Sequence, residues 1–228
     1  MTAPESIAIL VPVKDLSRAK SRLSPLLTLD ERRELAWLLL QGTLRTIAAA
    51  SAPGPRGLIT NYPPAISLGR SLGFAIIEET QQISESASVD AASAQLERNG
   101  ATGVLRIPLD LPVLAPDDLA PVLEAACSGA EAVLVPARDR LGTNALYRSP
   151  PTLFSSRFGP DSLTLHEQAA RAVATDVRVL PIEGFALDID DPQDVSELVR
   201  RAPACPGLDY LRSLDITTRL ERMAREPA

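Results

Sequence analysis

The chain places acidic residues directly after two apolar segments that are typical of buried β-strands. Asp110 follows residues 103–107, and Asp188 and Asp190 follow residues 184–187. In an open α/β sheet, side chains just beyond the carboxyl ends of the strands point into the crevice where ligands bind. Magnesium prefers hard oxygen ligands, usually one or two carboxylates together with substrate phosphates. These three aspartates are therefore candidate metal ligands, and the alternative is that they are ordinary turn and helix-capping residues.

A basic segment follows the first apolar run, residues 7–13. It carries four cations, Lys14, Arg18, Lys20 and Arg22, and it lacks the glycine spacing of a P-loop. A triphosphate that loses pyrophosphate requires cations to neutralise the charge that develops on the leaving group. The alternative is a solvated amphipathic turn. Carboxylates that hold a metal, facing cations that hold phosphates, indicate nucleotidyl transfer.

Two glycine-containing turns form a third candidate site, around Thr143 and around Gly159 and Ser162. Glycine lets backbone amides approach an anion closely, and a hydroxyl adds a donor. Ser162 also precedes a predicted helix, whose N-terminus favours a phosphate or a carboxylate. The alternative is two ordinary turns. His166, the only histidine of the chain, lies on the same helix, and we expect a structural role for it because transfer to an ionised acceptor needs no general base.

The elements that must position these residues alternate between strand and helix. Residues 28–31 have the spacing of a capping box, and a helical pattern continues to residue 47. Continuous apolar runs are typical of strands buried in a parallel sheet. The pattern therefore predicts an α/β fold with a mostly parallel sheet covered on both faces. The expected strands are 7–13, 57–60, 74–77, 103–107, 132–135, 144–147 and 177–180, and the further helices are 89–98, 116–128, 163–174, 192–201 and 208–225.

Length and charge limit the class of protein. The 228 residues suit one large domain with a sizeable core, and the net charge of -6 argues against a general nucleic-acid binder. No apolar run is long enough to span a bilayer, and the first residues do not have the pattern of a signal peptide, so we expect a cytoplasmic protein without membrane contact. Cys127 and Cys205 are predicted to be free thiols. We expect a domain at residues 1–201 and a helical extension at 202–228, packed on the domain or on a partner subunit.

Six segments, taken in order, resemble the 2-phospholactate guanylyltransferase family of deazaflavin coenzyme biosynthesis, which includes phosphoenolpyruvate and 3-phosphoglycerate guanylyltransferases. They span residues 11–195 and read VPVKDLSRAKSRLSPLL, DERRELA, IPLDLPVLAPDDL, GTNAL, FGPDSLTLH and LDIDDPQDV. The resemblance implies a three-layer, Rossmann-like, mixed and mostly parallel sheet of the nucleotide-diphospho-sugar transferase type. It implies that 2-phospho-L-lactate, phosphoenolpyruvate or 3-phospho-D-glycerate attacks the α-phosphorus of GTP and releases pyrophosphate.

The resemblance also assigns roles to residues. It implies that Asp110, Asp188 and Asp190 hold Mg²⁺ or Mn²⁺, and that the acceptor contacts Thr143, Gly159 and Ser162. Lys14, Lys20 and Asp110 would be catalytic. The nucleotide-binding residues would be Pro12, Lys14, Arg18, Lys20, Arg22, Ser88 and Asp90. At the last two positions the family usually has a glycine and an asparagine, and the Asp90 carboxylate would pair with the N–H donors of guanine.

Two other functions stay open. One is a sugar-phosphate or molybdenum-cofactor nucleotidyltransferase of the same fold, but such enzymes usually open with a glycine-rich loop, and no glycine occurs between Ile7 and Leu40. The other is a non-catalytic nucleotide-binding regulatory module, against which the three aspartates and the basic turn argue. The resemblance further implies a downstream transferase that uses the guanylylated product, and a homodimer.

Overall fold

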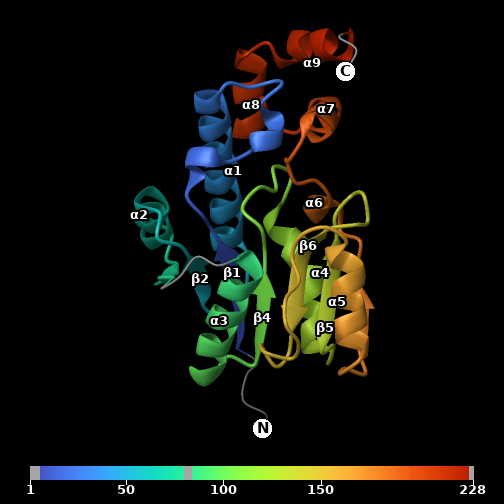
Figure 1. Cartoon of the computed structure of the whole chain (residues 1–228). Coiled ribbons are helices and arrows are strands. Elements are labelled where there is room, and N and C mark those ends of the chain that lie inside the picture. The colour runs from blue at the N-terminus through green and yellow to red at the C-terminus, as the bar shows by residue number, and fades with distance from the viewer. Residues whose placement is uncertain (1–5, 80–83, 226–228) are drawn as a thin grey trace.

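The computed structural model describes residues 6–79 and 84–225, and this part of the chain folds into a seven-stranded sheet flanked by helices (Figure 1). The strand order is β3-β2-β1-β4-β6-β5-β7. Strand β6 runs antiparallel to β4 and β5, and the other neighbouring pairs are parallel. The predicted mixed, mostly parallel sheet is therefore confirmed. The strands are β1 (Ile7–Pro12), β2 (Arg56–Ile59), β3 (Ala75–Ile77), β4 (Gly103–Arg106), β5 (Ala132–Pro136), β6 (Thr143–Arg148) and β7 (Val177–Val179).

The helices cover both faces of the sheet. In Figure 1, α3 and α5 lie in front of the sheet, whereas α1 and α4 lie behind it. Short 3-10 turns occupy Leu16–Arg18, Ser21–Leu23 and Pro116–Leu119. The helices are α1 (Leu29–Ala49), α2 (Pro63–Ser71), α3 (Glu85–Arg98), α4 (Ala120–Cys127), α5 (Ser162–Arg171), α6 (Glu183–Ala186), α7 (Pro192–Arg201), α8 (Pro206–Ser213) and α9 (Ile216–Arg225).

Strand β1 shows how the sequence produces two cores. Side chains alternate between the faces of a strand, so Ile7 and Ile9 pack with α1 while Ala8 and Leu10 pack with α3. The long helix α1 begins where its sequence predicts, because Thr28 accepts a hydrogen bond from the Glu31 amide and the Glu31 carboxylate accepts one from Thr28. Both faces of β1 are thus buried, and its carboxyl end is held at the centre of the sheet.

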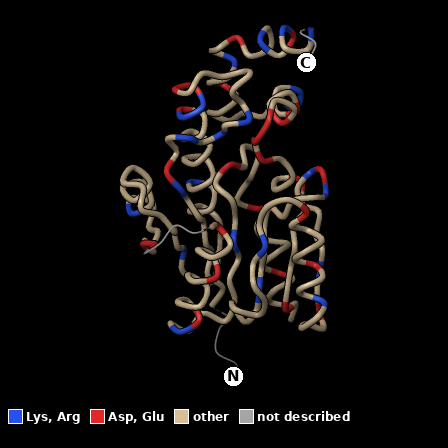
Figure 2. The backbone as a smooth tube through the Cα atoms, in the orientation of Figure 1, with Lys and Arg blue, Asp and Glu red and all other residues tan. Residues whose placement is uncertain are grey.

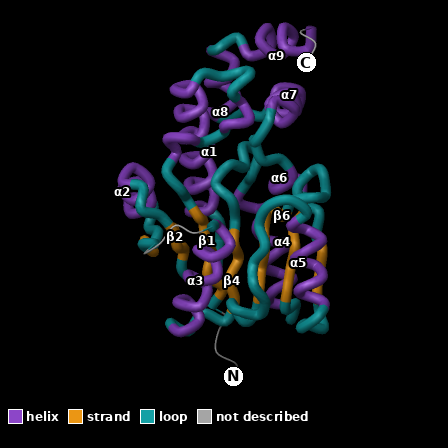
Figure 3. Tube along the Cα trace, viewed as in Figure 1, coloured by secondary structure: helices purple, strands orange, loops and turns teal. Residues whose placement is uncertain are grey.

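The C-terminal extension differs from its prediction. A single helix over residues 208–225 was expected, but α8 and α9 are separate, as Figure 3 also shows. The break is at Asp215, whose φ of 53° is left-handed and ends a right-handed helix. Leu208 and Leu211 of α8 pack in a core with Leu35 and Leu39 of α1. The domain division at residue 201 stays a prediction.

Sequence patterns missed helix α2. It opens with two prolines, which suit the first turn of a helix because proline lacks only an amide that would be unpaired there. Within the described ranges, neither Cys127 nor Cys205 forms a disulfide. Across residues 6–79 and 84–225, every helix is too short or too polar to cross a membrane.

Candidate active site

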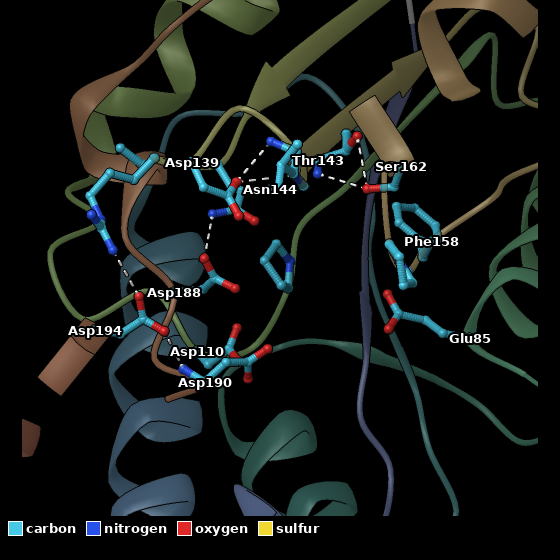
Figure 4. Close-up of a pocket in the computed structure, with 18 of the residues that line it drawn as sticks. Glu85, Asp110, Asp139, Thr143, Asn144, Phe158, Ser162, Asp188, Asp190 and Asp194 are labelled. Carbon is cyan, nitrogen blue, oxygen red and sulfur yellow. Dashed lines mark hydrogen bonds and ion pairs between the residues drawn. The ribbon is translucent and has the colours of Figure 1, made fainter. Parts of the chain in front are cut away.

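Two adjoining cavities lie at the carboxyl ends of the parallel strands. The larger has a volume of about 660 Å³ and the smaller about 320 Å³. Pro12, Glu85, Leu109, Asp110 and Asp190 line both, so the cavities form one crevice with a shared middle. Figure 4 shows the larger cavity, with the three predicted aspartate ligands on one side and Thr143 and Ser162 on the other. The crevice is at the edge of the sheet that the sequence predicts. The segment before Asp188 was expected to be a strand, but it is the short helix α6, so Asp188 and Asp190 reach the crevice from the loop after a helix.

Lys20 joins the two acidic turns. Its Nζ donates a hydrogen bond to Asp110 and another, of 3.1 Å, to Asp190. Burial alone lowers the pKa of Lys20, but the two carboxylates outweigh that effect and hold the pKa above its usual value. Lys20 also adopts a left-handed backbone conformation with a φ of 56°, which is uncommon for a residue with a side chain. The fold therefore holds a charged ammonium between Asp110 and Asp190.

Asp188 has a different environment. Its carboxylate accepts a hydrogen bond of 3.0 Å from Asn144 Nδ2, which also donates to the Phe185 carbonyl. Burial, together with the charge of Asp110, raises the pKa of Asp188 to about 6. The part of the chain that the structure describes gives Asp188 no basic partner at ion-pair distance. Asn144 was not singled out by sequence analysis, although it adjoins Thr143 at the start of β6.

The charge of the larger cavity bears on metal binding. Its described lining has eight carboxylates and only three guanidinium groups, so phosphorylated substrates would be repelled unless cations entered with them. Figure 2 shows acidic positions along the loops between the upper end of the sheet and α7. The acidic residues are Glu85, Asp110, Asp139, Asp161, Asp188, Asp190, Asp191 and Asp194, and the basic ones are Arg22, Arg106 and Arg138.

The donor chemistry fits a divalent cation of the magnesium type. Asp110, Asp188 and Asp190 supply hard oxygen ligands in one crevice, and Asp188 lacks a cationic partner among the described residues. In the described ranges no three acidic, cysteine or histidine side chains are already gathered as a closed metal cluster. The Lys20 ammonium lies between two of the three carboxylates, which shows that this position stabilises positive charge.

Six of the seven predicted nucleotide-binding residues border the crevice. Five of them border the smaller cavity: Pro12, Lys14, Arg18, Lys20 and Ser88. Arg22 lines the larger cavity instead. The Ser88 hydroxyl donates to the carbonyl of Ser84, which leaves its oxygen free to accept. The basic run therefore lies beside the crevice rather than on a distant surface.

Asp90 is the predicted residue that the structure does not bring to either cavity. Its carboxylate accepts hydrogen bonds from Arg148 (2.9 Å) and from the amide and hydroxyl of Ser156 (3.0 and 2.7 Å). The Arg148 side chain is almost fully buried. These contacts tie α3 to β6 and to the loop after it, and they occupy the carboxylate that was expected to contact a base.

We expect Asp90→Ala to lower stability and to leave the KM for the nucleotide unchanged. Removing the carboxylate leaves the buried Arg148 guanidinium with the Phe154 carbonyl and the Ser93 hydroxyl but without its carboxylate partner, and breaking a buried ion pair costs up to about 3–5 kcal/mol. Urea unfolding and steady-state kinetics measure the two effects. Gln95→Ala, on the exposed side of the same helix, is the control. A large rise in the KM for the nucleotide at unchanged stability would instead indicate that Asp90 contacts the nucleotide, as the family resemblance implied.

The predicted acceptor residues do lie together in the larger cavity. The Thr143 amide donates to Ser162 Oγ at 3.0 Å, and the two hydroxyl oxygens are 3.4 Å apart. Gly159 has a φ of 128°, a conformation that other residues rarely adopt, and the space where a Cβ would lie is empty. Thr143 at the start of β6 and Gly159 and Ser162 at the start of α5 thus form one corner of the crevice.

Arg106 was expected only as part of a strand, yet it lines the same corner. It is 6% exposed, donates to the Thr143 carbonyl at 3.3 Å and forms an ion pair with Glu85. Its guanidinium carbon lies 4.1 Å from the centre of the Phe158 ring. Nε of Arg106 is buried without a hydrogen-bond partner in the described structure. The available signal was a charged residue inside an apolar strand, because arginine is seldom buried without a partner.

Comparison with known proteins gives consistent results. The family model described as "Guanylyl transferase CofC like" matches residues 7–227. A phosphoenolpyruvate guanylyltransferase of Rubrobacter xylanophilus is 35% identical over 207 residues, which cover 90% of this chain and 97% of the relative. The enzyme of the same name from Sphaerobacter thermophilus is 34% identical, covering 87% of this chain and 95% of the relative.

Solved structures share the fold. A putative nucleotide-diphospho-sugar transferase from Desulfovibrio desulfuricans has a TM-score of 0.76 at 18% identity, covering 96% of this chain and 98% of that one. The glucosyl-3-phosphoglycerate synthase of Mycobacterium tuberculosis, solved with Mn²⁺ and uridine diphosphate, has a TM-score of 0.56 at 10% identity, covering 86% of this chain and 76% of that one. The predicted nucleotide-diphospho-sugar transferase type of fold is confirmed.

Proposed function

The chain belongs to the guanylyl transferase CofC-like family, and from this premise we propose that its acceptor is phosphoenolpyruvate or a closely similar phospho-carboxylic acid. The protein is a nucleotidyltransferase that transfers a guanylyl group from GTP. In the proposed reaction a phosphate oxygen of the acid forms a bond to the α-phosphorus. The bond from that phosphorus to the oxygen bridging to the β-phosphate breaks, and pyrophosphate leaves with the electron pair. Deazaflavin coenzyme biosynthesis is the proposed setting.

One observation carries this proposal: two cavities of different chemistry share Asp110 and Asp190. The basic run borders the smaller cavity, which suits a triphosphate. Thr143, Gly159 and Ser162 form one corner of the larger one, and the hydrogen-bond donors of this corner suit a small anionic acid. The two substrates would therefore meet at the aspartates, where the α-phosphorus must lie for transfer. A non-catalytic binding module would need only one of the two cavities.

We propose that Asp110, Asp188 and Asp190 hold Mg²⁺ or Mn²⁺. When bound, such a cation neutralises phosphate charge and aligns attacking and leaving oxygens. The excess of carboxylates in the larger cavity supports this assignment, as does the Mn²⁺ complex of a protein with the same fold. The chain's own cations have separate tasks: Lys14 and Arg18 bind the triphosphate, and Lys20 stabilises the charge that develops during transfer.

Arg22 and Ser88 complete the proposed contacts to the nucleotide. Arg22 reaches the larger cavity, so it faces the phosphates near the point of transfer, and Ser88 borders the smaller cavity beside Glu85. The downstream transferase, the homodimer and the cytoplasmic location stay predictions.

Pyrophosphate release tests the proposed function. The protein is incubated in turn with each of the four ribonucleoside triphosphates, with Mg²⁺, and with phosphoenolpyruvate, 2-phospho-L-lactate or 3-phospho-D-glycerate. We expect release with GTP that depends on the added acid. Release that instead requires a sugar phosphate would favour the related nucleotidyltransferases, and an absence of release with bound nucleotide would favour the regulatory module.

We expect Thr143→Val and Ser162→Ala to raise the KM for the acid by about ten- to a hundredfold with little change in the KM for GTP. Each hydroxyl donates to a charged group of the acid in the proposed complex, and such a bond contributes roughly 1.5–3 kcal/mol. Steady-state kinetics with each substrate varied in turn measures both constants.

Thr152→Val is the matched control for these acceptor variants, because Thr152 is exposed and lies outside both cavities. If Thr143→Val and Ser162→Ala weakened GTP alone, the two substrates would have to exchange places in the crevice.

A further inference from the structure

The imidazole of His166 lies directly behind the proposed acceptor corner. His166 is completely buried and does not line the cavity itself. Nδ1 is 3.0 Å from Thr143 Oγ1, and Nε2 accepts a hydrogen bond of 2.7 Å from the Arg157 amide. Phe158 packs edge-on against the ring at a centroid distance of 4.9 Å. Every polar atom of the ring is therefore engaged, and one of the two nitrogens contacts a residue of the acceptor site.

These contacts fix the position of the imidazole proton. A backbone amide only donates, so Nε2 must be the unprotonated, accepting nitrogen. A neutral imidazole has one N–H, which must then be on Nδ1 and donate to Thr143 Oγ1. Burial, with the neighbouring Arg106 and Arg148, lowers the pKa of His166 to about 4, which agrees with a neutral ring. His166 is thus a donor to the Thr143 hydroxyl.

The proton on Nδ1 limits where the two hydroxyl hydrogens of the site can lie. Thr143 Oγ1 accepts from His166, and Ser162 Oγ accepts from the Thr143 amide. The hydroxyls of Thr143 and Ser162 share a single contact of 3.4 Å, and one hydrogen at most can lie on it. Within the described structure, the other hydrogen has the cavity as its remaining direction. At least one hydroxyl is therefore always a donor toward the cavity.

We propose that His166 is a positioning residue that holds at least one of the Thr143 and Ser162 hydroxyls as a donor toward the cavity, so that this corner favours a group that accepts hydrogen bonds, such as an anionic oxygen. The identity of the group as the carboxylate or phosphate of the acid rests on the proposed function. An ammonium, which has donors but no acceptor, would meet that hydroxyl hydrogen instead of a lone pair. The nearby Arg106 is ion-paired with Glu85, but its buried Nε has no hydrogen-bond partner in the described structure, so it is a further donor on the same side.

The proton position is measured directly by nuclear magnetic resonance. His166 is the only histidine, so a chain labelled with ¹⁵N-histidine and carrying no histidine tag gives a single imidazole spectrum. We expect a neutral ring with its proton on Nδ1 at pH 7. A proton on Nε2, or an imidazolium at that pH, would overturn the proposal. This result does not depend on turnover, so it stands or fails separately from the proposed function.

Two substitutions separate positioning from mere packing. The amide nitrogen of asparagine is as many bonds from Cβ as Nδ1, whereas the end of glutamine corresponds to Nε2. His166→Asn therefore retains the donor to Thr143, and His166→Gln retains only the acceptor for the Arg157 amide. We expect His166→Gln to raise the KM for the acid at least tenfold, with the KM for GTP unchanged. We expect His166→Asn to stay within about threefold of the unsubstituted protein, although it unfolds more easily.

Equal rises in both variants, or a rise in the KM for GTP, would show that His166 only fills space. Titration calorimetry of phosphoenolpyruvate binding without nucleotide gives the same comparison when turnover is absent. If the unsubstituted protein binds the acid but does not turn it over, the proposed reaction fails and the positioning role remains. If His166→Gln binds the acid as tightly as the unsubstituted protein, the positioning role fails whatever the reaction is.

Discussion

Asp188→Asn is expected to lower kcat/KM by about a thousandfold. The substitution removes one proposed metal ligand and the negative charge that attracts the cation, and loss of such electrostatic stabilisation typically costs several kcal/mol in the transition state. Asparagine retains an oxygen that accepts the hydrogen bond from Asn144, so the local structure has no reason to rearrange. Steady-state pyrophosphate release at saturating Mg²⁺ measures the loss.

The same variant should be at least as stable as the unsubstituted chain. Because the folded-state pKa of Asp188 is about 6 and its ordinary value is 3.8, ionisation is disfavoured in the folded protein. That penalty is absent below about pH 4, grows between pH 4 and about pH 6, and is complete at higher pH. Without added metal, Asp188→Asn should therefore raise the melting temperature at pH 7 and leave it unchanged at pH 4.

Asp139→Asn is the matched control for Asp188→Asn. Asp139 lines the same cavity, but its carboxylate accepts hydrogen bonds from the amides of Leu141 and Gly142, as an asparagine oxygen also does. We expect a change in kcat/KM of less than about tenfold there. Near-normal activity of Asp188→Asn, or equal losses in both variants, would contradict the assignment of Asp188 as a metal ligand.

Lys20→Met is expected to lower kcat by about a hundred- to a thousandfold and to destabilise the fold as well. The ammonium stabilises charge during transfer in the proposed mechanism. Its removal also leaves Asp110 and the half-exposed Asp190 without their shared partner, and breaking the buried pair with Asp110 costs about 3–5 kcal/mol. Activity is measured well below the melting temperature of the variant, so that only folded protein contributes.

Arg18→Met controls for the loss of one positive charge from the same turn, because Arg18 is exposed and has no ion pair in the described structure. It should raise the KM for GTP modestly and leave stability unchanged. If Lys20→Met and Arg18→Met had equally small effects, the basic run would be the solvated amphipathic turn that its composition also allowed.

The fold could be predicted from sequence where an element is determined by residues close together in the chain, such as an apolar run or a helix cap. The apolar runs at residues 7–13 and 103–107 became the central strands β1 and β4, since both faces of each are buried. The capping box at Thr28 gave the start of α1 because its two hydrogen bonds are local in sequence. The break at Asp215 was not predictable, because it depends on one backbone conformation rather than on periodicity.

Hydrogen bonds and ion pairs between residues far apart in the chain could not be predicted from the sequence patterns. Lys20 meets Asp110 across 90 positions, and its role as a bridge between acidic turns follows only from the folded chain. Asp90 was expected at a base because its position matched a family element, yet tertiary contact with Arg148 occupies its carboxylate. Arg106 and His166 were not expected at the site. Each lies within a strand or helix pattern, and the contacts that bring it to the acceptor corner come from other elements.

The central claim is that the guanylyl group moves from GTP to a phospho-carboxylic acid. Two samples of GTP, one labelled at the α-phosphate and one at the γ-phosphate, are incubated with phosphoenolpyruvate and Mg²⁺, and the products are separated and weighed by mass spectrometry. We expect the α-label in a product with the mass of the acid joined to GMP through a diphosphate, and the γ-label in pyrophosphate. Transfer of the γ-label to the acid, or release of the γ-label as orthophosphate with no guanylylated acid, would contradict it.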